Sequence, residues 1–224
     1  MQGWLTFWFA YYPYICLTVM VFGIIGRYLY APESWNSHST EIMEKRWLRI
    51  GAPLFHVGVL LALAGHLAGL LFPDVVWEKL LGSSQRHDDI AMFVGKFVAI
   101  FMLVGLVILV ARKFVFQRVM KVAPLSDYLI ALLFFINIVT GMYQVFILEA
   151  PMFDLMGPWL RGLLTFQPDP SYMDAGPFFM KVHVVSAFTL FALIPFSRLV
   201  HFFSLPFTYA VRPYIVYRKR ETGM

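Results

Sequence analysis

Five long apolar runs constrain the fold of this chain more than any other feature. Each run reaches the roughly 20 residues that an α-helix needs to cross the hydrocarbon core of a bilayer. A backbone in lipid must satisfy its own hydrogen bonds, and the runs lack the alternating pattern of a membrane β-barrel. The sequence therefore predicts an all-α integral membrane protein with a single domain, residues 1–224, and five transmembrane helices over residues 4–26, 52–72, 90–111, 125–148 and 177–203.

The composition supports a membrane protein and excludes several kinds of cofactor site. Hydrophobic residues make up 60% of the chain and charged residues only 14%, whereas soluble domains carry about 25% charged residues. The one cysteine, Cys16, leaves this chain without disulfides, cysteine-ligated iron–sulfur clusters or cysteine-based zinc sites. Any redox role therefore requires an imported cofactor that is held by other ligands.

Lysine and arginine gather in alternate connections between the predicted helices. Because cytoplasmic loops carry the excess of these residues, the N-terminus is expected outside and the C-terminus in the cytoplasm. The net charge of +5 then reflects this bias and contact with lipid headgroups, with no nucleic-acid partner implied. The long connection over residues 149–176 is expected to cap the outer ends of the helices. The deciding residues are Arg27, Lys45, Arg46 and Arg49, then Arg112, Lys113, Arg118 and Lys121, and finally Arg212, Arg218, Lys219 and Arg220 in the tail.

Four of the six histidines lie within predicted spans, where ionisable side chains are costly and are functional candidates. His38 and His87 belong to polar connections, whereas His56 and His66 lie in the second span and His183 and His201 in the fifth. These two spans run antiparallel, so His56 shares its depth with His201, and His66 shares its depth with His183.

The spacing of these histidines also carries information on the two helices. Ten residues separate the first two histidines, a rise of about 15 Å, and eighteen separate the other two, a rise of about 27 Å on one helix face. The unequal rises predict helices that cross or are inclined, with a kink at Pro195.

Two facing imidazoles within the membrane point to haem. Zinc needs three or four protein ligands, whereas haem iron already has four porphyrin nitrogens and takes histidine as an axial ligand. The pattern predicts two stacked b haems between the second and fifth helices, although a single intramembrane histidine can equally be an interhelical hydrogen-bond donor. Small residues leave room for the macrocycle, or serve only helix packing: Gly58, Gly65, Gly69, Ser186 and Ala187. The candidate partners of the haem carboxylates, which can equally be ordinary membrane anchors, are Arg27, Arg112 and Arg198.

The segments PLFHVGVLLALAGHLAG and LIPFSRLVHFFSLP resemble the cytochrome b-type gamma subunit of membrane-bound respiratory nitrate reductase. The similarity extends over essentially the whole chain, with YYPYI in the first span and AMF at the start of the third. It implies a five-helix anchor of the inner (cytoplasmic) membrane that oxidises quinol and holds two b haems, with the histidines paired as above. It also implies two partners on the cytoplasmic side, an iron–sulfur subunit and a molybdenum-containing subunit that reduces nitrate, so this chain itself supplies no catalytic residue for nitrate reduction.

The resemblance also places a quinol site beside the outer haem. It maps to Gly65, His66 and the loop that enters the third helix, where the family has a lysine. This chain has Gln85, Arg86 and His87 there, so Arg86 and His87 are the candidate quinol-binding residues of that loop. The acceptor of the quinol protons can be Asp88 or Asp89, which can equally be solvated carboxylates. The departure leaves open whether the substrate is menaquinol or ubiquinol, and the direction of electron flow.

Two alternatives remain at this stage. The same dihaem architecture can serve another cytoplasmic oxidoreductase or run in reverse, towards nitrite oxidation or quinone reduction. A more distant alternative is a proton-coupled transporter with histidine relays, which would require acidic residues within the spans, and none is expected there.

Overall fold

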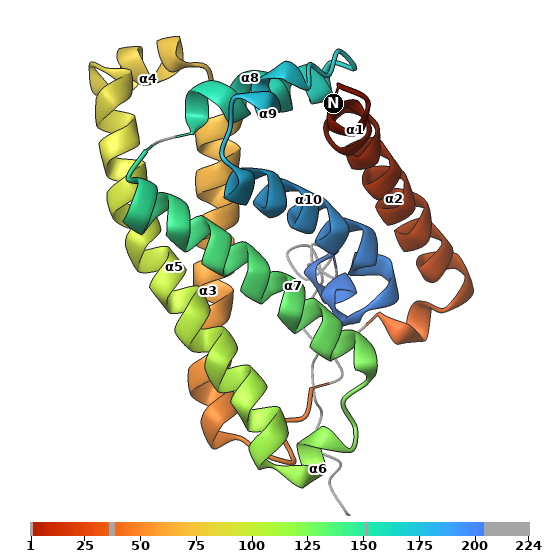
Figure 1. Ribbon diagram of the computed structural model, residues 1–224. Helices are drawn as coiled ribbons and strands as arrows, with labels where there is room; N and C mark the ends of the chain where they lie inside the picture. Colours follow the sequence, from red (N-terminus) through yellow and green to blue (C-terminus); the bar gives the residue numbers. More distant parts are fainter. Residues whose placement is uncertain (1, 36–38, 151, 204–224) are drawn as a thin grey trace, which may run out of the picture.

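The computed structural model describes residues 2–35, 39–150 and 152–203, and over these residues every regular element is helical (Figure 1). The predicted basic tail and His38 lie outside the described residues. The elements are α1 (Gln2–Thr6), the π-helical turn η1 (Phe7–Tyr11), α2 (Tyr12–Tyr30), η2 (Pro32–Ser34), α3 (Arg46–Leu71), α4 (Asp74–Leu81), α5 (Ser84–Val115), α6 (Gln117–Met120), α7 (Leu125–Met142), the π-helical η3 (Tyr143–Leu148), α8 (Phe153–Leu164), α9 (Ser171–Asp174), α10 (Phe178–Leu193), and the 3-10 helices η4 (Ile194–Phe196) and η5 (Arg198–Phe203).

Five helices of the described chain are long and apolar enough to cross a membrane, as the sequence predicted. Large apolar side chains such as Phe22, Phe93 and Leu132 are exposed on them, as expected for a surface that faces lipid. The expectation that the spans contain no acidic residue was wrong. Asp127 lies in the first turn of α7, where it pairs with basic side chains, and Asp88 and Asp89 lie near the start of α5. The spans are Gly3–Tyr30, Arg46–Leu71, Ser84–Val115, Leu125–Leu148 and Phe178–Phe196.

The spans pack in a continuous series of neighbours, in which α5 joins α3 to α7, and α7 joins α5 to α10. α3 packs tightly along α5, whereas α10 packs on α7 and α2, and α3 and α10 are not among the closely packed helix pairs. Figure 1 shows α7 crossing in front of α3, with α10 beside α7. The tight pair depends on glycine: a Cβ on Gly58 would lie 3.0 Å from the backbone nitrogen of Met102, and one on Gly105 would lie 2.5 Å from that of Phe55. α3 therefore uses one face for α5 and leaves another face free toward α10.

The connection that was predicted to be a cap is a helix, α8, at the same end of the molecule as α4 and α9 (Figure 1). Its Trp159 is buried against Phe9, to whose carbonyl the indole Nε1 donates a hydrogen bond of 2.9 Å. Tyr14 in turn donates to the carbonyl of Leu163 at 2.7 Å. These contacts tie α8 to the start of the first span. We call this the α8 end of the molecule, and the opposite end, which carries α6, the α6 end.

The last span is not one continuous helix to residue 203, so the expected rise of 27 Å between its histidines is wrong. Pro195 has no N–H to continue the helix, and α10 ends at Leu193. Ser197 is extended, and its hydroxyl accepts from the backbone N–H of Leu199 at 3.2 Å, as a cap at the start of a new helical segment does. The chain therefore changes direction between α10 and η5, which accounts for the unequal histidine spacing.

Candidate functional site

The structure brings the four histidines that were predicted within the spans together in two facing pairs, although His201 lies in η5, beyond the described fifth span. The ring centroids of His56 and His201 are 5.9 Å apart, and those of His66 and His183 are 6.0 Å apart. The first pair lies nearer the α6 end and the second nearer the α8 end. The rings of the second pair are nearly parallel, at 10°, whereas those of the first pair are inclined at 61°.

Backbone carbonyls orient all four imidazole rings. The Nδ1 atoms of His56 and His66 lie 2.7 and 2.6 Å from the carbonyl oxygens of Ala52 and Ala62, one helical turn earlier. The Nδ1 of His201 has the carbonyl of Arg198 as its partner. Because a carbonyl oxygen can only accept, each Nδ1 carries the proton, and each Nε2 has a free lone pair with which to bind a metal.

His183 is oriented by α7 rather than by its own helix. Its Nδ1–H is shared between the hydroxyl of Thr140, at 2.9 Å, and the carbonyl of Asn137, at 3.1 Å. Asn137 also donates to Ser186, one turn further along α10, at 2.9 Å. Thr140 and Asn137 were not predicted as positioning residues, although two polar residues inside an otherwise apolar span were the available signal.

The geometry of each pair fits one metal ion between two imidazoles. An imidazole nitrogen binds a transition metal at about 2 Å, so two rings on opposite sides of one ion have centres roughly 6 Å apart. Within the described residues, no cluster of three or more His, Cys, Asp or Glu side chains is suited to hold a metal. Two ligands per site therefore fit a metal that brings its other ligands with it, as haem iron does.

Of the small residues that were expected to make room for a macrocycle, Gly65 has open space beside it. A Cβ on Gly65 would meet no described atom within 4 Å, and Gly65 and His66 are both exposed on α3. Gly58 instead packs on α5, and a Cβ on Gly69 would lie 2.5 Å from the ring of Phe153 in α8. Gly58 and Gly69 therefore serve helix packing, which was the alternative interpretation of these residues.

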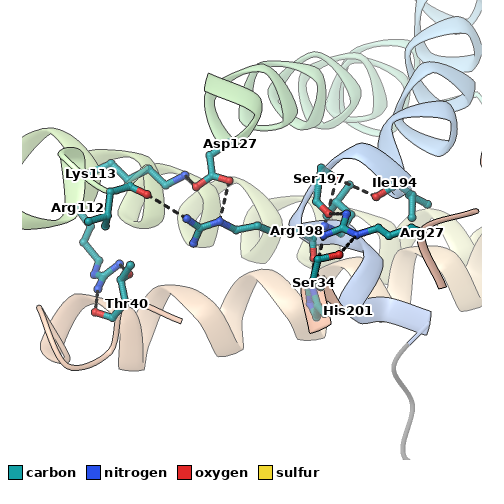
Figure 2. Close-up of polar contacts among 12 residues, drawn as sticks. Arg27, Ser34, Thr40, Arg112, Lys113, Asp127, Ile194, Ser197, Arg198 and His201 are labelled. Carbon is teal, nitrogen blue, oxygen red and sulfur yellow. Dashed lines mark hydrogen bonds and ion pairs between the residues drawn. The ribbon is translucent and has the colours of Figure 1, made fainter. Parts of the chain in front are cut away.

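Two of the three predicted carboxylate partners line a common cavity at the α6 end. The cavity has a volume of about 500 Å³, and Arg27 and Arg198 both contribute to its wall. Arg112 is instead buried in an ion pair with Glu44, at 2.6 Å. It also donates to the hydroxyl of Thr40 at 2.9 Å (Figure 2). Most of the hydrogen-bonding capacity of Arg112 is thus used within the chain.

Glu44 lies in the connection before α3, and its surroundings favour the charged carboxylate. Its desolvation raises its pKa, but the backbone N–H groups of Trp47, Arg46 and Leu48 and the Arg112 guanidinium outweigh this, so the pKa of Glu44 lies below its ordinary value. The ion pair therefore fixes the connection against α5.

The expectation that Arg86 and His87 lie in a polar connection was wrong: both belong to the first turn of α5, which begins at Ser84, and they occupy different environments there. Arg86 is exposed, and its Nη1 donates to the carbonyl of Leu81 at 2.8 Å. His87 is buried; it stacks on Trp77 with centroids 4.2 Å apart, and its Nδ1 lies 3.0 Å from a carboxylate oxygen of Asp88. Asp88 therefore has a partner and is not simply solvated.

Phe153 of α8 packs between His87 and α3. Phe153 contacts the ring of His87, with centroids 5.0 Å apart, and also packs on Gly69, three residues after His66.

An ion pair between α5 and the end of η3 was not predicted from the sequence. Lys96, inside the third span, pairs with Glu149 at 2.9 Å, and Glu149 adopts a positive φ of 45°. The available signal was a lysine in the middle of an apolar run.

Comparisons with known proteins give a consistent result. The family model described as nitrate reductase gamma subunit matches residues 5–220. The nitrate reductase gamma chain of Bacillus subtilis is 39% identical over 213 residues, which cover 93% of this chain and 96% of that protein. The respiratory nitrate reductase 2 gamma chain of Escherichia coli is 34% identical over 221 residues, covering 96% and 97%. An Hdr-like menaquinol oxidoreductase cytochrome b-like subunit of Archaeoglobus profundus is 25% identical over 162 residues, covering 71% of this chain and 48% of that protein.

Proposed function

Because the chain belongs to the nitrate reductase gamma subunit family, we propose that it oxidises quinol near the outer membrane face and delivers the electrons to a cytoplasmic partner. It is a multi-pass membrane subunit of an oxidoreductase complex, and its family is of the cytochrome b type. The proposed partners are an iron–sulfur subunit and a molybdenum-containing subunit, which reduces nitrate. The proposed location is the inner (cytoplasmic) membrane, with residues 1–224 as one domain.

The observation that carries this proposal is the pair of facing imidazoles at two depths, with every Nδ1 hydrogen bonded elsewhere. His56 and His201 would hold one haem b, and His66 and His183 the other. Bound there, the two haems supply one-electron redox chemistry between the two ends of the protein. The chain itself fixes the ligands, keeps their Nε2 atoms unprotonated and surrounds the site with apolar helices.

The distribution of Lys and Arg supports an α8 end that faces outside and an α6 end that faces the cytoplasm. The proposed quinol site lies at the α8 end, at the open space beside Gly65 and His66, with Arg86 and His87 as further candidates. Each quinol gives two electrons and two protons. The protons leave to the outside, with the His87–Asp88 pair as the proposed acceptor, and the electrons reach the partner at the α6 end.

Arg27 and Arg198 are the better-supported partners for haem carboxylates, because both line the cavity at the α6 end. Arg112 is retained only as a weaker candidate, because it is buried and is not among the residues that line this cavity.

The test is the visible spectrum and haem content of the purified complex. We expect a b-type α band on reduction with dithionite and about two haems per chain. His66→Ala should remove one haem and abolish reduction by quinol, while dithionite still reduces the other haem; His38→Ala, outside the spans, is the matched control. If quinol reduced His66→Ala at the normal rate, the proposed position of the oxidation site at the α8 end would be wrong.

A second candidate function is the same architecture in the service of another cytoplasmic oxidoreductase, or in reverse. The similarity to the Archaeoglobus cytochrome b-like subunit supports this second candidate function, since that protein is named as a subunit of a different complex. Identification of the subunits that co-purify with this chain distinguishes the two. Family membership argues against the proton-coupled transporter.

A further inference from the structure

His201 differs from the other three histidines because no α-helix holds it. His56 and His66 lie within α3 and His183 within α10, whereas His201 lies in η5, a six-residue 3-10 segment beyond the break at Pro195. Such segments have poorer hydrogen-bond geometry than α-helices and seldom persist beyond three or four residues. The position of His201 must therefore be set by contacts with other elements.

The first such contact comes from α2. Arg27 donates from Nη1 to the carbonyl oxygens of Pro195, at 2.7 Å, and Ser197, at 2.8 Å, both within the break between α10 and η5 (Figure 2). Its Nε and Nη2 donate to the hydroxyl and carbonyl of Ser34, at 2.9 and 2.7 Å. Gly23, one turn earlier, lets α2 approach: a Cβ there would lie 2.6 Å from Cγ of Pro195. Arg27 thus binds the carbonyls that the broken helix leaves without internal donors.

The second contact comes from α7 and acts through Arg198. A carboxylate oxygen of Asp127 lies 3.2 Å from Nε of Arg198, and the other lies 3.0 Å from Nζ of Lys113 (Figure 2). The side chain of Asp127 is only 8% exposed, so solvent screens this pair little. Arg198 also donates to the carbonyl of Val122 at 3.3 Å, and its own carbonyl accepts from Nδ1 of His201. The residue that orients the imidazole is therefore itself held by Asp127.

We propose that Arg27 and Asp127 are positioning residues for His201: together they hold the segment after the helix break so that its imidazole faces His56. This inference rests on the proposed function, in which His201 is an axial ligand. It gives Arg27 a role distinct from that of a carboxylate partner. Partners of a metal ligand typically change metal affinity by roughly 10–100-fold when they are removed.

The experiment compares Asp127→Asn and Arg27→Lys in the full complex with Glu149→Gln, which breaks an ion pair of similar length at the α8 end. The readouts are haem content, the midpoint potential and the low-spin EPR signal of each haem. His201→Ala and His66→Ala assign the two signals. Asp127→Asn and Arg27→Lys are the two tether variants. We expect both to shift or weaken the EPR signal that His201→Ala removes, and to lower retention of that haem roughly 10–100-fold. The other signal should stay unchanged, and Asp127→Glu should restore the first.

The proposal is overturned if neither haem signal changes in either tether variant. It is also overturned if both haems are lost equally, since equal loss indicates general destabilisation. Hydrogen–deuterium exchange of residues 197–203 gives a readout that needs no haem. Exchange there should become faster in Asp127→Asn and stay unchanged in Glu149→Gln; unchanged exchange in both would also refute it. If His201→Ala and His66→Ala both keep two haems, the proposed ligation is wrong, and the exchange data still decide the role of Arg27 and Asp127.

Discussion

Gly105→Ala tests the close contact between α3 and α5, on which the free face of α3 depends. The new Cβ would lie 2.5 Å from the backbone nitrogen of Phe55 and 2.8 Å from its Cα. Optimal separations between non-bonded carbon atoms are about 3.5–4.0 Å, so the helices would have to move apart by roughly 1 Å. The obstacle is backbone within a helix, which no change of rotamer can remove.

The expected loss follows from two opposed contributions. Overpacking costs about 1–3 kcal/mol, and a contact with backbone belongs at the upper end of that range. Alanine gains up to about 1 kcal/mol over glycine in helix propensity. The net expectation is a destabilisation of about 2 kcal/mol. Because Phe55 precedes His56, the shift should also weaken haem binding by the pair at the α6 end.

The matched control is Gly95→Ala in the same helix, where a Cβ would make an ordinary contact of 3.5 Å with Val145. We expect it to be neutral or slightly stabilising. The assay is thermal unfolding of the detergent-solubilised complex, followed by far-UV circular dichroism and by release of haem. If Gly105→Ala unfolds at the same temperature as Gly95→Ala, the close α3–α5 contact is refuted.

Three further perturbations test other parts of the structure. Thr140→Val removes the hydroxyl partner of His183 while the carbonyl of Asn137 remains, so redox titration should show a shifted potential for one haem without its loss. Trp159→Phe leaves the buried carbonyl of Phe9 without its donor and should lower stability by about 1–3 kcal/mol, measured by thermal unfolding; an unchanged midpoint would contradict the role of α8 as a packed cap. Glu44→Gln should remove a pH dependence: the folded pKa of Glu44 is lowered, so its stabilising contribution is complete above the unfolded pKa and is lost as pH falls through the folded pKa. The stability difference between wild type and Glu44→Gln should therefore be constant near neutral pH and shrink in acid, and a difference that grows in acid would reverse the assigned sign.

Most of the span positions could be predicted because transfer of side chains into lipid is a local property of the sequence. The same holds for the depth pairing of the histidines, which requires only that successive spans alternate in direction. The error at the fifth span was partly visible in the sequence, because Pro195 predicted a kink. The new helical start at Ser197 was not visible, because it also depends on Arg27 of α2, which donates to the carbonyl of Ser197. The exact partners of Arg112 and Asp127 were likewise beyond prediction, because both are set by connections that fold back on the spans.

The sequence by itself determined an all-helical membrane protein with five spans and two histidines on each of two antiparallel spans, because hydropathy and helix direction are read along one dimension. Only the tertiary structure decided that one histidine stands beyond a helix break and that α2 and α7 supply its supports. Arg27 and the carbonyl of Pro195 are 168 positions apart in the chain, and a contact at that separation leaves no periodic signal in either segment. It arises from the packing of whole helices, which brings distant polar groups into the one arrangement that satisfies them in lipid.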